Sequence, residues 1–93
     1  MIQGFADAET QRFWTTRRSR RLPGDIHERA MMKLMQLHHA SVLNDLRIPP
    51  SNHLEALRKD RDGQHSIRIN GQWRVCFRWT DHGPDAVAIV DYH

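Results

Sequence analysis

The stretch Ser66–Trp79, SIRINGQWRVCFRW, decides the fold because it has the pattern of two β-strands joined at Asn70-Gly71. Its large apolar side chains occupy odd-numbered positions: Ile67, Ile69, Trp73, Val75, Phe77 and Trp79. Its even-numbered positions include Ser66, Arg68, Gln72, Arg74, Cys76 and Arg78. Successive side chains of a strand point to opposite faces, so the stretch predicts an antiparallel hairpin with one apolar face and one cationic face.

The length of the loop decides whether the two faces stay separate. A two-residue loop would place Ile67 opposite Arg74 and mix apolar with cationic side chains. A three-residue loop, 69–71, pairs Ile67 with Trp73, and we expect Gly71 to take the left-handed conformation there. The cationic face alone does not indicate a binding role, since antiparallel sheets often keep one face in water.

Size and composition indicate one small globular domain, residues 1–93, with an affinity for polyanions. A chain of 93 residues with 39% hydrophobic residues can bury a single core. Fourteen Lys and Arg against eleven Asp and Glu give a net charge of +3. Most of these cations are arginines, whose planar fork suits phosphate.

The same survey predicts a cytoplasmic protein without a membrane partner. No apolar run approaches the roughly 20 residues of a spanning helix. The N-terminus carries Ile2, Phe5 and Asp7 rather than a basic start followed by an apolar block. The single cysteine, Cys76, cannot form an internal disulfide, which suits a reducing compartment.

The first half of the chain predicts a short strand and two helices. Residues 1–5 should form a short edge or inserted strand, and a helix capped by Asp7 should end near Thr16. The longer helix should begin at 23–25, end at 38–39 and cover the apolar face of the hairpin with a periodic stripe: Ile26, Ala30, Leu34 and Leu37.

Two features of this half suggest sites but have simpler explanations. The basic run Arg17–Arg21 can contact phosphate or an acidic partner, yet a solvated connector is the favoured interpretation. The pair His38-His39 has no cysteine or carboxylate at ligand spacing, so we interpret it as a helix end and expect no metal site.

The second half predicts the remaining strands. We expect a strand over Asn52–Lys59, a charged turn whose Gly63 has a positive φ, the central hairpin, and a last strand over Ala86–Val90. The last strand runs into Asp91-Tyr92-His93.

Two segments resemble the HigB branch of the RelE-like toxins of bacterial toxin-antitoxin systems: LEALRKDRDGQHSIRINGQWRVCFRW at 54–79 and VDYH at 90–93. The resemblance implies an α+β fold with a short N-terminal strand and two helices packed on a twisted antiparallel sheet of four to five strands. It also implies a toxin that cleaves messenger RNA in the ribosomal A site without a metal or another cofactor.

The resemblance further implies the partners and the catalytic residues. The partners are the 70S ribosome, its messenger RNA and a HigA-type helix-turn-helix antitoxin. Operator DNA is a partner only through that antitoxin. The family positions that match this sequence are Arg58, Arg74, Asp91, Tyr92 and His93. In one departure, Glu55 stands where the family commonly has histidine; Arg58 replaces a lysine and keeps its charge.

These residue types fit cleavage by attack of the 2′-hydroxyl on its own phosphate, which needs a base, an acid and cations. His93 is the expected base, because histidine titrates near neutrality, and Asp91 on the same strand face can orient it. Tyr92 should point to the opposite side and act on a base only if the tail twists. Arg74 is expected to bind the phosphorane, with Arg58 as the second cation.

The remaining charged residues of this half are expected to contact the RNA without reading its sequence: Glu55, Lys59, Arg61, Arg68 and Arg78. Trp73 and Trp79 fall on the apolar face and should belong to the core, and Cys76 should be inert.

Two other functions fit the same residues. One is a module of this fold that occupies a ribosomal or RNA site without cutting, which the change at Glu55 suggests. The other is a regulatory protein whose basic face binds an antitoxin or operator DNA.

Overall fold

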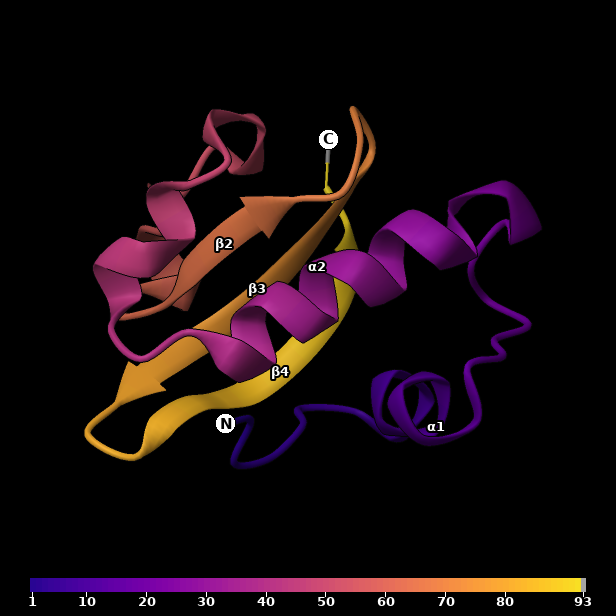
Figure 1. The fold of residues 1–93 in the computed structure, drawn as a ribbon, viewed down its shortest axis with the longest axis horizontal. Helices are drawn as coiled ribbons and strands as arrows, with labels where there is room; N and C mark the ends of the chain where they lie inside the picture. The colour runs from indigo at the N-terminus through magenta and orange to yellow at the C-terminus, as the bar shows by residue number, and fades with distance from the viewer. Residues whose placement is uncertain (93) are drawn as a thin grey trace.

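The molecule is a layer of two helices on a four-stranded antiparallel sheet (Figure 1). The structure is a computed structural model and describes residues 1–92. Its helices are α1 (Ala8–Thr16) and α2 (His27–His39), and its strands are β1 (Glu55–Ala56), β2 (His65–Arg68), β3 (Trp73–Thr80) and β4 (Gly83–Asp91). Each strand pairs with the next along the chain, in the order β1-β2-β3-β4. The predicted α+β fold is confirmed.

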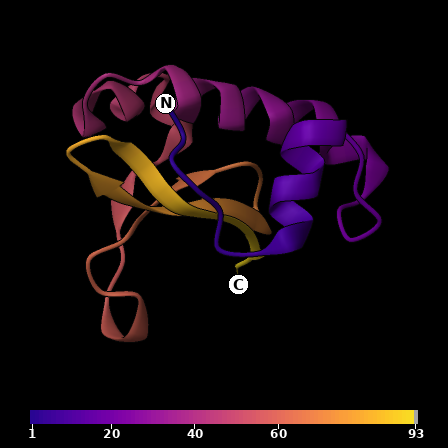
Figure 2. The same ribbon diagram turned by 90° about the horizontal axis from the view of Figure 1, so that it is seen from below.

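Four short 3-10 helices connect these elements within the described residues: η1 (Gly24–Ile26), η2 (Leu43–Arg47), η3 (Pro50–Asn52) and η4 (Lys59–Arg61). Figure 2 shows α2 above the sheet and η4, in salmon, below it. The two faces of the sheet are therefore covered by different parts of the chain.

The core lies between α2 and the odd-numbered face of the hairpin, as the sequence predicts. Ile67, Val75 and Phe77 are fully buried there, and so are the α2 side chains of the predicted stripe, Leu34 and Leu37. Burial of each of these side chains contributes roughly 1.5–3 kcal/mol. This packing fixes the other, even-numbered face of β2 and β3 on the side away from α2.

Helix α1 begins and ends where the sequence predicts. The Asp7 carboxylate accepts a hydrogen bond of 2.7 Å from the Thr10 N–H and caps the helix. Arg17 adopts the left-handed conformation, with φ of 63°, and ends it after Thr16.

The N-terminal residues run parallel to β4 along the edge of the sheet. The Gln3 N–H donates to the Pro84 carbonyl at 2.8 Å, and the Ala6 N–H donates to the Val87 carbonyl at 2.9 Å. Phe5 forms a single parallel bridge with Val87. The predicted first strand is thus reduced to one bridge at the edge.

The central hairpin has the predicted faces but a different loop. Ile67 lies opposite Val75, not Trp73, and the loop spans 70–72. Gly71 is not left-handed as expected; instead the Asn70 side-chain oxygen accepts hydrogen bonds of 2.8 Å from the backbone N–H groups of Gln72 and Trp73. Because this register differs from the predicted one by two residues, every side chain keeps its face.

The predicted strand over Asn52–Lys59 is wrong, since only Glu55–Ala56 forms a strand. Asn52 is fully buried: its amide N–H donates to the Leu46 carbonyl, and its oxygen accepts from the Lys33 ammonium at 2.6 Å. His53 then takes a left-handed φ of 44° and turns the chain. A buried polar anchor of this kind cannot be read from the alternation of apolar residues.

The last strand starts earlier than predicted, at Gly83 rather than Ala86. Gly83 has a φ of 126°, and the Met1 carbonyl oxygen lies 2.5 Å from the position of a Cβ, so only glycine fits. Ala86 takes a φ of 50° at a bulge opposite the β3 segment between Cys76 and Arg78. The positive φ predicted for Gly63 is confirmed at 88°.

Candidate functional site

The even-numbered face of the sheet is partly enclosed. It therefore differs from the fully solvated cationic face that the sequence alone would also allow. Ser66 and Cys76 are fully buried on it, and Arg74 is only 8% exposed. Leu57, which follows β1, is also buried, and its N–H donates to the carbonyl of Gln64, the residue before β2. The segment after β1 therefore forms one wall of a site whose floor is β2 and β3.

Arg74 is the most firmly held cation of this site. Its Nε donates to the Ser66 hydroxyl at 2.8 Å, and its Nη2 donates to the carbonyl oxygens of His53 and Ser66. Its Nη1 lies 3.7 Å from a Glu55 carboxylate oxygen. Glu55 stands directly opposite Ser66 on the neighbouring strand, so the β-ladder itself places the carboxylate beside the guanidinium.

Tyr92 lies on the same face as Arg74, which overturns the expectation that it points away from the catalytic groups. Arg74 pairs with Val90 across β3 and β4, and Tyr92 is two residues further on. The Arg74 guanidinium carbon lies 5.8 Å from the centre of the Tyr92 ring. That distance is within the range of a cation–π contact.

Asp91 lies at the strand end opposite Trp73, on the side of the odd-numbered face. The Gln72 amide donates to its carboxylate at 3.1 Å. The expected base, His93, lies outside the described residues.

Of the other cations predicted to contact RNA, Arg68 lies next to Arg74, and the remaining ones lie in the segment around η4 or further along β3. Arg68 is exposed and is the cross-strand partner of Arg74. Arg58 and Lys59 are exposed and Arg61 is half-buried, all in or next to η4. Arg78 covers the turn at Gly63, four residues along β3 from Arg74, which corresponds to about 13 Å of strand.

The predictions for Cys76, Trp73 and Trp79 are confirmed. Cys76 is fully buried. Burial raises the pKa of its thiol, against the opposing charges of Arg61 and Arg74. A neutral buried thiol is a poor nucleophile. Trp73 is buried in the core and Trp79 packs against it.

Sequence reasoning missed two groups of the site: the Ser66 hydroxyl and the His53 carbonyl, both of which bind Arg74. Ser66 occupies an even position of β2, so its hydroxyl emerges on the same face as the arginines. That position is the signal that could have identified it as a partner of Arg74. The carbonyl gives no signal, because its position depends on the left-handed turn at His53.

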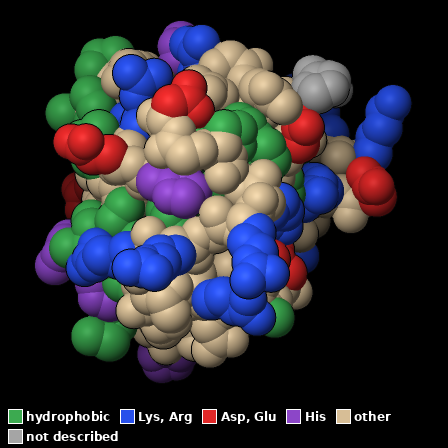
Figure 3. All heavy atoms as spheres, turned by 90° about the vertical axis from the view of Figure 1, so that its right-hand side faces the viewer, with side chains coloured by type: hydrophobic (Ala, Val, Ile, Leu, Met, Phe, Trp, Pro, Cys, Tyr) green, Lys and Arg blue, Asp and Glu red, His purple; other side chains and the backbone are tan. Residues whose placement is uncertain are grey.

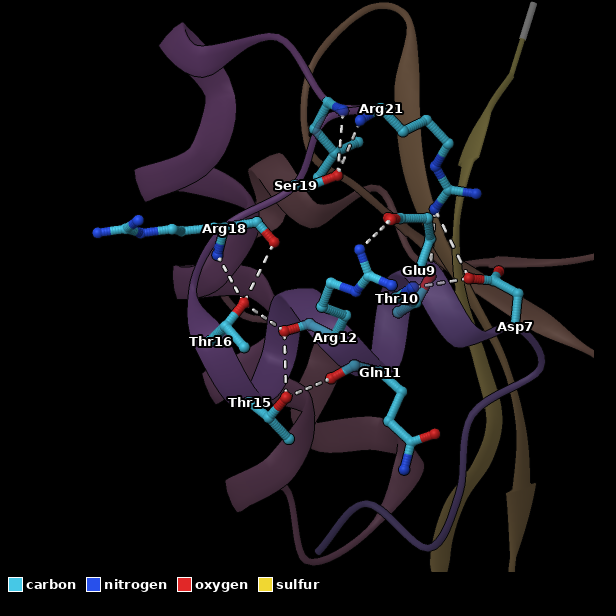
Figure 4. A network of polar contacts seen from close by, with 11 residues as sticks. Asp7, Glu9, Thr10, Gln11, Arg12, Thr15, Thr16, Arg18, Ser19 and Arg21 are labelled. Carbon is cyan, nitrogen blue, oxygen red and sulfur yellow. Dashed lines mark hydrogen bonds and ion pairs between the residues drawn. The ribbon is translucent and has the colours of Figure 1, made fainter.

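A second basic surface lies on α1 and the α1–α2 connection (Figure 3). Part of the run Arg17–Arg21 is structural: Arg21 Nη2 donates to the Ile89 carbonyl at 2.9 Å and lies 3.8 Å from Asp7. Figure 4 shows Arg21 directed toward Asp7, whereas the Arg18 side chain extends away from this network. With Arg12 and Arg20, Arg18 lines an open hollow of about 420 Å³.

Within residues 1–92, no three histidine, cysteine or acidic side chains lie close enough together to hold a metal ion. No helix in that range is long and apolar enough to cross a bilayer.

Comparison with known proteins adds a family to this geometry. Residues 3–93 match the family model described as the RelE-like toxin of type II toxin-antitoxin system HigB. The chain is 38% identical over 82 residues to Toxin HigB-1 of Vibrio cholerae serotype O1, covering 87% of this chain and 86% of that protein. It is also 32% identical over 62 residues to an uncharacterised protein of Haemophilus influenzae, covering 67% of this chain and 61% of that protein.

Proposed function

Because the chain belongs to the RelE-like HigB toxins of type II toxin-antitoxin systems, we propose that it is an endoribonuclease that cleaves messenger RNA in the ribosomal A site. A toxin of such a system has an antitoxin partner. We propose that this antitoxin is a HigA-type helix-turn-helix protein, that the toxin reaches operator DNA only through it, and that the toxin works on cytoplasmic ribosomes.

The observation that supports cleavage best is the preorganised Arg74. Three acceptors and one carboxylate hold its guanidinium in a nearly buried position. A cation fixed in this way can stabilise the charge that develops on a phosphorane without reorganising during the reaction. Arg58 in the adjoining segment is proposed as the second cation.

The proton transfers are assigned to the end of the chain. His93 takes the proton of the 2′-hydroxyl, and the 2′-oxygen then attacks its own phosphorus. The bond to the 5′-oxygen breaks, and that oxygen takes a proton from a water molecule. The products are a cyclic phosphate and a 5′-hydroxyl end, and no metal or cofactor is needed. Asp91, two residues before His93, is assigned to orient the imidazole, and it does so from the other side of β4 than Arg74.

Glu55 and Tyr92 are proposed to position Arg74 and the RNA. Glu55 forms an ion pair with Arg74 and so directs Nη1 toward the open side of the site. Tyr92 is 40% exposed beside the guanidinium and offers its ring to a base. Lys59, Arg61, Arg68 and Arg78 bind the backbone.

The experiment uses ribosomes carrying a defined messenger RNA, to which the purified toxin is added. New 5′-hydroxyl ends within the A-site codon are the expected result, in the presence of a metal chelator that leaves the ribosome intact. Inhibited translation without new 5′ ends would contradict cleavage. It would favour the second candidate, a ribosome-binding module of the same fold, which the glutamate at position 55 in place of the family's histidine suggests.

A further inference from the structure

An open hollow of about 580 Å³ lies between α2 and the β2–β3 loop. Three cations line it, Arg29 and Lys33 from α2 and Arg68 from β2, together with polar groups of Ser51 and Asn70. No carboxylate of residues 1–92 lines it. We refer to this space as the Lys33 hollow.

Lys33 is a buried cation. It is only 4% exposed, and its ammonium donates to the Asn52 amide oxygen at 2.6 Å. Among residues 1–92 no carboxylate forms an ion pair with it. Burial, and after it the positive charge of Arg29, lowers the pKa of Lys33. A buried charge is usually paired, so this position favours a bound anion.

Arg29 and Arg68 strengthen the same preference. Both are exposed, so a ligand in the hollow can reach them. Asp25 and Glu28 line an adjoining hollow that shares Arg29, but neither forms an ion pair with it. The cations of the Lys33 hollow are therefore available to an external anion.

Arg68 also connects this hollow to the candidate site. It stands directly opposite Arg74 in the antiparallel ladder. Like charges in such a pair repel each other, and an anion between or beside them relieves the repulsion. Arg68 is therefore both the ladder neighbour of Arg74 and part of the lining of the Lys33 hollow, so a polyanion that contacts Arg74 can reach the hollow past Arg68.

We propose that the Lys33 hollow binds a phosphate group, and that the group is a phosphodiester of the RNA strand that passes Arg74. Arg29 and Arg68 bind the phosphate oxygens through their N–H groups, and Lys33 supplies the buried charge below them. Contacts of this kind to phosphate hold the strand irrespective of its sequence. The identity of the strand as RNA substrate rests on the proposed function; the affinity for phosphate does not.

Nuclear magnetic resonance of the full chain tests both parts with two probes. The first probe is inorganic phosphate. The second is a single-stranded RNA with 2′-O-methyl groups throughout, which cannot be cleaved by 2′-hydroxyl attack. Each probe should shift the amide signals of Asn70 and Gly71 and raise the pKa of Lys33.

Variants then assign the effect to the hollow. Arg29→Gln should weaken binding of the methylated RNA several-fold and lower the slope of log affinity against log salt by about 0.7, the value for one phosphate contact to a single strand. Arg47→Gln removes an exposed arginine that lines none of these hollows. It should change both the RNA affinity and the salt slope less than Arg29→Gln does. Lys33→Met should abolish the phosphate shifts; if that variant does not fold, Arg29→Gln carries the test.

The outcomes separate this proposal from the proposed function. Unshifted signals with both probes would overturn the phosphate site, even if the toxin cleaves messenger RNA. Shifts with inorganic phosphate, but equal RNA affinities for the Arg29 and Arg47 variants, would overturn the assignment to RNA. Shifts with both probes in a protein that cleaves nothing would support the hollow and refute the nuclease.

Discussion

The Arg74 guanidinium lies against the ring of Tyr92, with its central carbon 5.8 Å from the ring centre. This contact joins the beginning of β3 to the residue that follows β4. The Tyr92 N–H also donates to the Gln72 carbonyl at 2.6 Å, which holds the end of the strand beside the β2–β3 loop. The last described residue of the chain is therefore part of the site through its ring and its backbone.

Replacing Arg74 should reduce cleavage more than any other change on this face. We expect Arg74→Ala to lower the cleavage rate on programmed ribosomes by about 10² to 10³, the usual cost of one preorganised charge contact. Arg74→Lys should not restore it, because three separate nitrogens of the planar guanidinium contact Ser66, His53 and Glu55, and a compact ammonium lacks that fork.

The matched control is Arg47→Ala, an exposed arginine of η2 outside the site. It should cleave at the rate of the unaltered chain. Equal rates for the Arg74 and Arg47 variants, both folded by circular dichroism, would contradict the role of Arg74.

The Tyr92 ring, rather than its hydroxyl, should matter for positioning Arg74. Tyr92→Phe keeps a ring beside the guanidinium and should retain most of the activity. Tyr92→Leu loses the cation–π contact, worth about 0.5–1 kcal/mol at an exposed position, and should lower the rate of cleavage at saturating toxin about two- to fivefold. Equal loss in both variants would instead assign the effect to the hydroxyl.

Glu55 should behave as a positioning residue and His93 as the base. The rate of the unaltered chain should fall at acidic pH, because a histidine that acts as a base must be unprotonated. His93→Ala should abolish most of the cleavage activity, and the activity that remains should no longer depend on pH in this way. Glu55→Gln should cost less than tenfold and keep the profile, since the amide oxygen can still face Arg74. A hundredfold loss, with the acidic limb of the profile gone, would make Glu55 the base.

Lys33 should make the folded state more stable as the pH rises into the alkaline range. Its pKa is lowered in the folded state, by burial first and by Arg29 second. The unfolded chain then binds more protons between that lowered pKa and the ordinary value of about 10.4, so stability rises with pH across this window. Urea unfolding at a series of pH values should show the rise relative to Lys33→Met; parallel curves for the two proteins would contradict it.

The sequence predicted the elements that depend on periodicity or on a local cap. Alternation in Ser66–Trp79 separates the faces of the hairpin, and the four-residue spacing in α2 marks the stripe that covers one of them. The Asp7 cap is equally local, since donor and acceptor lie three residues apart. Such signals need no knowledge of distant parts of the chain.

The errors fall where distant groups decide the backbone. The strand expected over Asn52–Lys59 is interrupted because Asn52 binds Lys33 of α2 and the Leu46 carbonyl. The last strand begins at Gly83, which pairs with Thr80 and leaves room for the Met1 carbonyl oxygen. Neither contact changes the pattern of apolar and polar residues around Asn52 or Gly83, so that pattern could not predict it.

For the candidate site, the sequence by itself determined which residue types are present and that Arg68 and Arg74 share a face, because a two-residue repeat fixes the side on which each side chain emerges. The packing of strands and helices decided that Glu55, Ser66 and the His53 carbonyl hold Arg74 and that Tyr92 joins it. It also decided that Lys33 is buried with no carboxylate of residues 1–92 paired to it. The physical reason is that burial and ion pairing depend on distances between separate strands and helices, which the packing of the whole chain sets.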